Sequence, residues 1–402
     1  MLHGSLPPPA PRAGCALEVL LAFTRLGLTS FGGPIAHLGH FQRELVERRR
    51  WVDHATWADL VALCNFLPGP ASSQLAMSLG IERAGHLGGL AAWVGFTLPS
   101  ALVLTLFAAG LGAFAAPEQA GAIHGLKVVA VPVVGLAIQG MAQRLCPDGR
   151  RATIAVASAA AALALDSALA QVLIMALAGA LGWALWRGEP RSGDPALRAP
   201  LPAWQGVLAW VAFSGLLLAL PLLRAALAHP GLDVFERFYR VGALVFGGGH
   251  VVLPLLEHEV VDPGWTTSER FLAGYGAAQA VPGPLFSFAA YLGFLLDTTP
   301  TRWSGAALAL VAIFLPAWLL VVGALPFWAR LRASAACQAA LRGTNAAVVG
   351  LLLAAFYDPV WRVAIQSRAD FALGLTGYLA LAVWGAPPWL VVAASALVSS
   401  LL

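Results

Sequence analysis

Two Pro-Gly-Pro runs interrupt strongly apolar stretches of this chain, at residues 65–74 (NFLPGPASSQ) and again at residues 279–287 (QAVPGPLFS). Proline removes a backbone donor, clashes with the preceding turn and pushes the residue before it out of helical geometry, so neither run can lie inside an unbroken helix. A helix broken within hydrocarbon exposes backbone polar groups. Membrane proteins tolerate this only where protein buries those groups or where they line a cavity. We therefore predict a binding site at these two breaks.

The composition indicates a membrane protein. Of the 402 residues, 59% are hydrophobic and only 11% are charged, which is too little charge for the surface of a soluble protein. Several windows of about 20 residues are apolar and nearly free of charge, as a bilayer span requires. We predict an all-α polytopic membrane protein with broken or re-entrant helices at the Pro-Gly-Pro runs. The four cysteines have no metal or redox spacing, and no cofactor, metal or nucleic acid is expected.

The apolar segments predict the order of the helices. In the first part of the chain they lie at 15–31, 57–80 (with the first break), 87–115, 121–143, 153–165 and 168–186. An amphipathic segment at 37–50 is expected at the membrane interface. A polar stretch at 187–202 precedes one apolar helix at 204–227. Further helices are predicted at 235–246, 271–295 (with the second break), 304–325, 337–356, 371–384 and 389–402.

The chain contains an internal repeat with an offset of 214 or 215 residues. Arg25 aligns with Arg240, residues 31–33 (FGG) align with 246–248, and the two Pro-Gly-Pro runs align with each other. Chance similarity between apolar segments would not keep that register across Pro, Gly and Arg, so we infer a duplication. The predicted units are a disordered tail (1–14), a first repeat (15–187), a polar linker with a connecting transmembrane helix (188–231) and a second repeat (232–402).

The relative orientation of the two repeats depends on how residues 57–80 run. If they cross the membrane once, each repeat has six spans and the linker helix inverts the second copy. If they form a re-entrant hairpin, each repeat has five spans and the copies are parallel. The loop arginines do not decide between these counts. We favour inverted repeats, because duplications joined by an odd helix usually serve alternating access in secondary transporters.

Each break offers hydrogen-bond donors to an anion. The residues after the second proline begin a new helix, whose free backbone N–H groups and dipole favour negative charge. Neighbouring serines and amides add further donors. The predicted substrate-binding residues are Asn65, Pro68, Gly69, Pro70, Ser72 and Ser73 in the first copy, and Gln279, Pro282, Gly283, Pro284 and Ser287 in the second. The alternative is a packing kink whose serines bond to their own backbone.

Cationic side chains form a second candidate group. Arg25 and Arg240 occupy equivalent places inside apolar helices, where an arginine costs about 2.5–3.5 kcal/mol on insertion scales and needs a partner or a hydrated cavity. We predict a cationic site between the repeats, since arginine suits bidentate recognition of tetrahedral oxyanions. Pairing with helix-end carbonyls, or snorkelling to an interface, is the alternative. Lys127 is a weaker candidate. Close backbone approach to a ligand, or a helix-packing seam, is predicted at Gly32, Gly33, Gly247 and Gly248.

Two acidic residues are candidates for proton coupling. Glu44 and Glu259 are matched acids that follow the first helix of each copy. A carboxylate in poorly solvated surroundings can have a raised pKa and can then exchange protons near neutral pH. The alternative is an ordinary interfacial carboxylate that forms ion pairs with neighbouring arginines.

Long motifs carry a resemblance to a known family. Residues 23–37 (FTRLGLTSFGGPIAH) and 65–74 closely resemble the N-terminal signature of the chromate ion transporter family. Residues 240–256 (RVGALVFGGGHVVLPLL) resemble the matching signature of its C-terminal domain. The resemblance runs from about residue 17 to the end of the sequence, and the layout is similar to the long-chain, two-domain form of that family.

The resemblance implies a multi-pass protein of the bacterial inner membrane. Such a protein would export chromate from the cytoplasm, driven by the proton gradient, and so give chromate resistance. Its partners would be chromate, protons and the lipid bilayer, and a homodimer is left open. Transport of sulfate or another tetrahedral oxyanion is the alternative. An intramembrane enzyme is disfavoured, because residues 258–262 (HEVVD) lack the second histidine of a zinc motif and no Gly-x-Ser-x-Gly elbow occurs.

Overall fold

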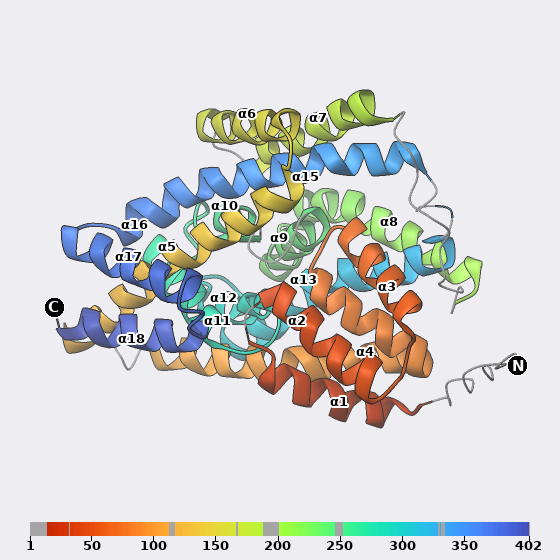
Figure 1. The fold of residues 1–402 in the computed structure, drawn as a ribbon, viewed down its shortest axis with the longest axis horizontal. Coiled ribbons are helices and arrows are strands. Elements are labelled where there is room, and N and C mark those ends of the chain that lie inside the picture. Colours follow the sequence, from red (N-terminus) through yellow and green to blue (C-terminus); the bar gives the residue numbers. More distant parts are fainter. Residues whose placement is uncertain are drawn as a thin grey trace, which may run out of the picture.

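The computed structural model describes residues 14–31, 33–111, 117–165, 168–187, 201–245, 252–328, 330 and 334–401. Within these ranges every regular element is a helix, as the sequence predicts (Figure 1). The first repeat contains α1 (Ala16–Thr29), α2 (Gly33–Phe41), η1 (Gln42–Arg48), α3 (His54–Phe66), α4 (Ala71–Leu111), α5 (Pro117–Leu145), α6 (Gly149–Leu165) and α7 (Ala168–Trp186). The linker helix is α8 (Ala203–Leu227). The second repeat contains α9 (Pro230–Leu244), α10 (Val252–Val260), α11 (Ser268–Ala280), η3 (Leu285–Ser287), α12 (Phe288–Leu295), α13 (Arg302–Ala324), η4 (Leu325–Phe327), α15 (Ala335–Ala355), η5 (Phe356–Trp361), α16 (Arg362–Ala364), α17 (Arg368–Ala382) and α18 (Pro388–Leu401).

Both Pro-Gly-Pro runs break their helices. The chain leaves helical geometry between α3 and α4, and again between α11 and η3. The central glycines have positive φ angles, 118° at Gly69 and 108° at Gly283, a conformation that residues with a Cβ avoid. The boundary predicted between residues 80 and 87 is confirmed, because Ala84 and Gly85 leave helical geometry and divide the segment labelled α4 into two helices. Whether either broken segment is re-entrant stays a prediction.

Equivalent helix pairs form the centre of each repeat. α1 packs along α4, and α9 packs along α13. At the first crossing the backbone of Gly27 lies against Gly95 and Phe96, and at the second Gly242 lies against Ile313. A Cβ on either glycine would collide with a carbonyl oxygen of the facing helix. The small residue therefore permits the close approach of each pair, and it does so at matching places in the two repeats.

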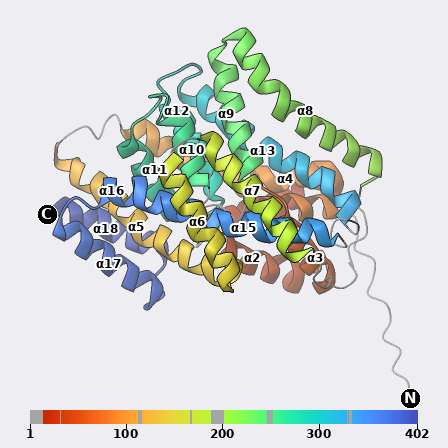
Figure 2. The same cartoon turned by 90° about the horizontal axis from the view of Figure 1, so that it is seen from above.

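The terminal helix pairs are exchanged between the repeats (Figures 1 and 2). α6 and α7 of the first repeat pack on α15 of the second, while α17 and α18 of the second pack on α5 of the first. Glycines again allow close contact: Gly343 of α15 lies against the carbonyl of Ala178, and Gly125 of α5 lies against the carbonyl of Ser395. The two repeats are therefore intertwined, and each covers the long helix of the other.

Five helices of the described chain are long and apolar enough to cross a bilayer, namely Ala71–Gly110, His124–Leu145, Ala203–Leu227, Arg302–Phe327 and Ala335–Ala364. The linker helix α8 lies at the edge of the molecule (Figure 2). Its outward leucines are largely uncovered, with Leu218 71% and Leu222 72% exposed. Such a surface suits hydrocarbon and not water. The protein is thus a multi-pass membrane protein, while the number of spans and the orientation of the repeats stay predictions.

We predict that Gly343→Ala destabilises the exchanged packing of α15 on α7, because its Cβ would collide with the Ala178 carbonyl. Overpacking of this kind costs about 1–3 kcal/mol. Gly215→Ala on α8 is the matched control, since nothing lies within 4 Å of its Cβ position and alanine favours a helix over glycine by about 1 kcal/mol. The midpoint of thermal unfolding in detergent should fall only for Gly343→Ala. Equal midpoints for the two variants would contradict the close contact.

Candidate functional site

The two breaks are joined to opposite repeats by a reciprocal pair of backbone hydrogen bonds. The Gly69 N–H donates to the carbonyl oxygen of Val245 at 2.6 Å, and the Gly283 N–H donates to the carbonyl oxygen of Ser30 at 3.0 Å. Ser30 and Val245 are the residues that directly follow α1 and α9. Each break therefore docks on the open end of the first helix of the other repeat. This interface between the repeats is the candidate site.

At the first break, the side-chain donors differ in exposure and in hydrogen bonding. The Gln74 side-chain amide donates to the carbonyl oxygen of Pro68 at 2.7 Å. Ser72 is buried, whereas Asn65 is exposed. The hydroxyl of Ser73 is buried and has no hydrogen-bond partner among the described residues. Ser73 thus keeps a free donor at this break.

At the second break the predicted serine is not free. The Ser287 hydroxyl donates to the carbonyl oxygen of Pro284 at 2.6 Å, which is the self-satisfied arrangement that the packing-kink alternative describes. The side-chain nitrogen of Gln279, in contrast, is buried and has no partner in the described ranges. Ser100 of α4 faces this break, with its Oγ 2.9 Å from the position that a Cβ on Gly283 would take.

Arg25 does not face the repeat interface. It is exposed on α1, on the same side as Leu21 and Leu28, which are 63% and 55% exposed. α1 packs on α4 through its other face, which includes Phe23 and Leu26. The prediction that Arg25 is buried within its helix is wrong, because the apolar character of both faces concealed which one meets α4.

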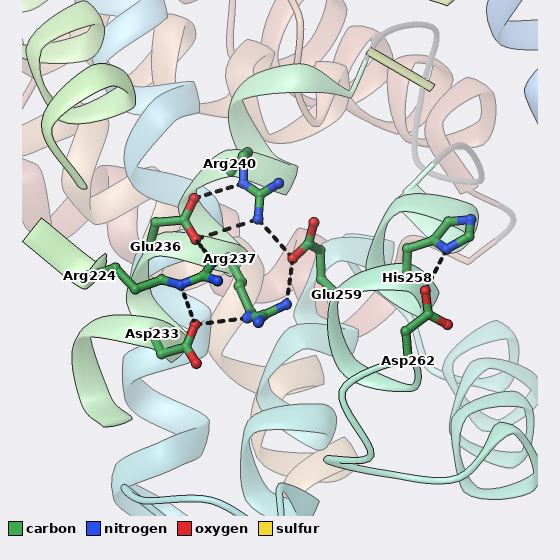
Figure 3. A network of polar contacts seen from close by, with 8 residues as sticks. All are labelled: Arg224, Asp233, Glu236, Arg237, Arg240, His258, Glu259 and Asp262. Atoms are coloured by element: carbon green, nitrogen blue, oxygen red, sulfur yellow. Dashed lines mark hydrogen bonds and ion pairs between the residues drawn. The ribbon is translucent and has the colours of Figure 1, made fainter. Parts of the chain in front are cut away.

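Arg240 lies in a network of ion pairs that joins α8, α9 and α10 (Figure 3). Its guanidinium contacts Glu236 at 2.7 Å and Glu259 at 2.9 Å. The remaining pairs are Arg224 with Glu236 (2.9 Å) and Asp233 (3.1 Å), and Arg237 with Asp233 (2.8 Å) and Glu259 (3.1 Å). The carboxylates compensate the arginines. Arg25 and Arg240 consequently stand in unlike surroundings and do not make the matched cationic pair that their alignment suggests.

The matched acids Glu44 and Glu259 also differ. Glu44 pairs with Arg48 at 3.0 Å and Arg49 at 2.8 Å. Burial alone would raise the pKa of Glu44, but the hydrogen bonds and charges of Arg49 and Arg48 hold it below its usual value. Burial raises the pKa of Glu259, and the charges of Arg240 and Arg237 offset only part of that effect. Glu259 is therefore the better suited of the two to exchange protons near neutral pH.

The remaining candidates lie around these features. Lys127 is buried in α5, 9% exposed, and its charge acts on Glu269 at the start of α11. Gly33 begins α2 with a positive φ of 75°, a conformation that favours glycine. Gly32, Gly247 and Gly248 lie outside the described residues. Among the described residues, no group of three or more His, Cys, Asp or Glu side chains could hold a metal ion.

Intertwined repeats with reciprocally docked helix breaks are the architecture of a duplicated helical carrier. The chain belongs to the chromate transporter family, whose sequence profile matches residues 17–183 and 232–400. It is a transporter and not an enzyme.

Similar proteins carry related names. A chromate transport protein of Cupriavidus metallidurans is 27% identical over 84% of this chain and 81% of its own length. A protein with the same name from Pseudomonas aeruginosa is 28% identical over 85% of this chain and 80% of its own length. A probable chromate transport protein of Synechococcus elongatus is 27% identical over 89% of this chain. No solved structure shows a significant match to the chain.

We predict that Glu236→Gln strongly destabilises the protein, because Glu236 is 1% exposed and pairs with both Arg224 and Arg240. Removing one partner of a buried ion pair costs about 3–5 kcal/mol in soluble proteins. Glu44→Gln is the matched control. Its partner Arg48 is 62% exposed, so the cost should stay below about 1 kcal/mol. Thermal unfolding of both variants in detergent checks the difference, and equal midpoints would show that the network contributes no more than a surface pair.

Proposed function

We propose that this protein exports chromate from the cytoplasm across the bacterial inner membrane, in exchange for protons, and so gives chromate resistance. The observation that carries the proposal is the reciprocal docking of the two breaks, Gly69 on Val245 and Gly283 on Ser30. It brings broken helices of both repeats to one interface, where a carrier can bind its substrate. The names of the relatives favour chromate as that substrate.

A tetrahedral oxyanion suits the donors of this interface. Its four oxygens accept hydrogen bonds in several directions, and hydroxyl, amide and backbone N–H groups at the breaks supply donors from several elements. Hydrogen bonds to an ionised acceptor are roughly twice as strong as bonds between neutral groups. Sulfate shares the shape and charge of chromate and is the second candidate substrate, because nothing in these donors discriminates between the central atoms.

Proton coupling is assigned to Glu259 within this proposal. Its carboxylate is 4% exposed and lies against two arginines of α9, with Arg240 at 2.9 Å and Arg237 at 3.1 Å. Protonation of Glu259 would break its ion pairs with Arg237 and Arg240 and so weaken the contact between α9 and α10. A movement of α9 would be transmitted to the first break, because the Gly69 N–H is hydrogen-bonded to Val245, the residue that follows α9.

Transport into everted membrane vesicles tests the proposal. Vesicles that contain the protein should accumulate chromate when respiration acidifies their interior, and vesicles without it should not. An uncoupler should abolish the accumulation. Accumulation that survives the uncoupler would exclude proton coupling. Accumulation of sulfate without any of chromate would exclude chromate as the substrate.

We predict that Glu259→Gln loses proton-driven accumulation but keeps exchange of labelled chromate between the two sides of the membrane, because the variant can no longer release a proton there. Glu44→Gln serves as the control, since the pKa of Glu44 already lies below its usual value and the group stays ionised. It should accumulate chromate as the unmodified protein does. Proton-driven accumulation by Glu259→Gln would remove Glu259 from the coupling step.

A further inference from the structure

The surroundings of the two breaks differ in polarity at equivalent positions. Gly283 of the second break lies against α4 near Ser100, and Gly69 of the first break lies against α13 near Ala317. These two contacts correspond, because the helix prolines Pro99 and Pro316 directly precede them. The positions that surround the second break are Ser30, His37, Thr97 and Ser100, and their counterparts around the first break are Val245, Val252, Phe314 and Ala317. Four polar residues thus correspond to four apolar ones.

Hydrogen bonds place the first-repeat residues of this group around Gly283. The carbonyl oxygen of Ser30 accepts the Gly283 N–H at 3.0 Å and the His37 Nε2–H at 3.2 Å. The Ser100 hydroxyl donates to the carbonyl oxygen of Thr97 at 2.9 Å. The Ser100 Oγ and the carbonyl oxygen of Phe96 lie 2.9 Å and 3.3 Å from the position that a Cβ on Gly283 would take, so the turn of α4 that carries Thr97 lies at the second break. Gln279 stands at the end of α11, from which this break follows.

Several polar atoms of this group are buried without a protein partner. Ser30 is 0% exposed, and His37 and Thr97 are each 1% exposed. Their Oγ, Nδ1 and Oγ1 atoms, together with the Nε2 of Gln279, have no hydrogen-bond partner in the part of the chain that the structure describes. Buried polar groups are almost always bonded. The hydroxyls of Ser30 and Thr97 and the amide nitrogen of Gln279 are donors, and together they point to a ligand with acceptor oxygens. The Nδ1 of His37 is an acceptor, because Nε2 carries the proton, so it does not bind such a ligand.

The donors are also unevenly divided between the breaks. At the second break Ser30, Thr97 and Gln279 each keep an unused donor. At the first break the buried donor without a partner is that of Ser73, because the Gln74 amide nitrogen is bonded to Pro68 and its remaining buried atom is an acceptor oxygen. An anion needs donors, so the second break suits it better.

We infer that the tetrahedral oxyanion is bound at the second break, by Ser30, Thr97 and Gln279, with His37 and Ser100 as positioning residues. These five residues are the second-break cluster. The inference rests on the proposed function in taking an oxyanion as the substrate. The cluster consists of uncharged hydroxyl, amide and imidazole groups from both repeats. The first break serves to hold the repeats together and contributes at most the hydroxyl of Ser73.

Hydroxyl-deletion variants test the cluster in everted vesicles. Ser30→Ala and Thr97→Val each remove a donor without adding bulk, and each should raise the apparent KM for chromate roughly tenfold or more, the effect of losing a hydrogen bond to a charged group. Thr97→Ser keeps the donor and should restore the KM. Thr376→Val removes an exposed hydroxyl of α17 that donates to the carbonyl oxygen of Ala372 in its own helix, and it should change the KM less than threefold. Membrane levels of each variant show that insertion is intact.

A binding measurement separates this inference from the proposed function. Chromate and sulfate should each raise the unfolding temperature of the purified protein, and the rise should disappear in Ser30→Ala and Thr97→Val but not in Thr97→Ser. If vesicles take up no chromate, the proposed function fails, while a rise that depends on these hydroxyls still supports the cluster. An unchanged KM and an unchanged rise in both deletion variants, or no rise with either anion, would overturn it.

Discussion

The pair of hydrogen bonds between breaks and helix ends is the constraint on which the rest of the fold depends. A Pro-Gly-Pro run leaves backbone groups without helical partners, and hydrocarbon offers none. This protein satisfies the central N–H of each run with a carbonyl from the other repeat, Gly69 with Val245 and Gly283 with Ser30. One repeat alone would leave its own break unsatisfied. The same requirement explains why the repeats are intertwined, since each break has to reach across to the first helix of the partner repeat.

The duplication does not make the two halves equal in this structure. Residues 271–278 of α11 are all buried, against neighbours that include α5 and α18. Its counterpart α3 buries mainly one face, through residues such as Leu60 and Leu63, and its end carries the exposed Asn65. The helix that leads into the second break is therefore enclosed more fully than the helix that leads into the first. Alternating access in duplicated carriers depends on such a difference, because equivalent halves must be open and closed in turn.

Sequence patterns predicted the backbone of the site much better than its side chains. Proline and glycine act on their own chain, so the two breaks follow from local chemistry. The direction in which Arg25 points could not be predicted, because both faces of α1 are apolar. The face that packs on α4 is buried, and the opposite face carries the exposed Leu21 and Leu28. Ser30 and Thr97 are unremarkable residues individually. What distinguishes them is that the equivalent residues of the second repeat, Val245 and Phe314, are apolar. This difference becomes visible only when the two repeats are aligned through Pro99 and Pro316.

The placement of charge fits the needs of a carrier. Three carboxylates form ion pairs with Arg224, Arg237 and Arg240 and connect the linker helix α8 to α9 and α10. The positive charge of these arginines is therefore compensated within the protein and stabilises its helix packing. A buried free arginine would bind a dianion tightly, yet a carrier has to release what it binds. Neutral hydroxyl and amide donors bind an oxyanion more weakly. They select for its tetrahedral shape, because each hydrogen bond requires an acceptor oxygen in a particular direction. Under the proposed coupling, the arginines link protonation of Glu259 to the position of α9, while the neutral donors bind the anion.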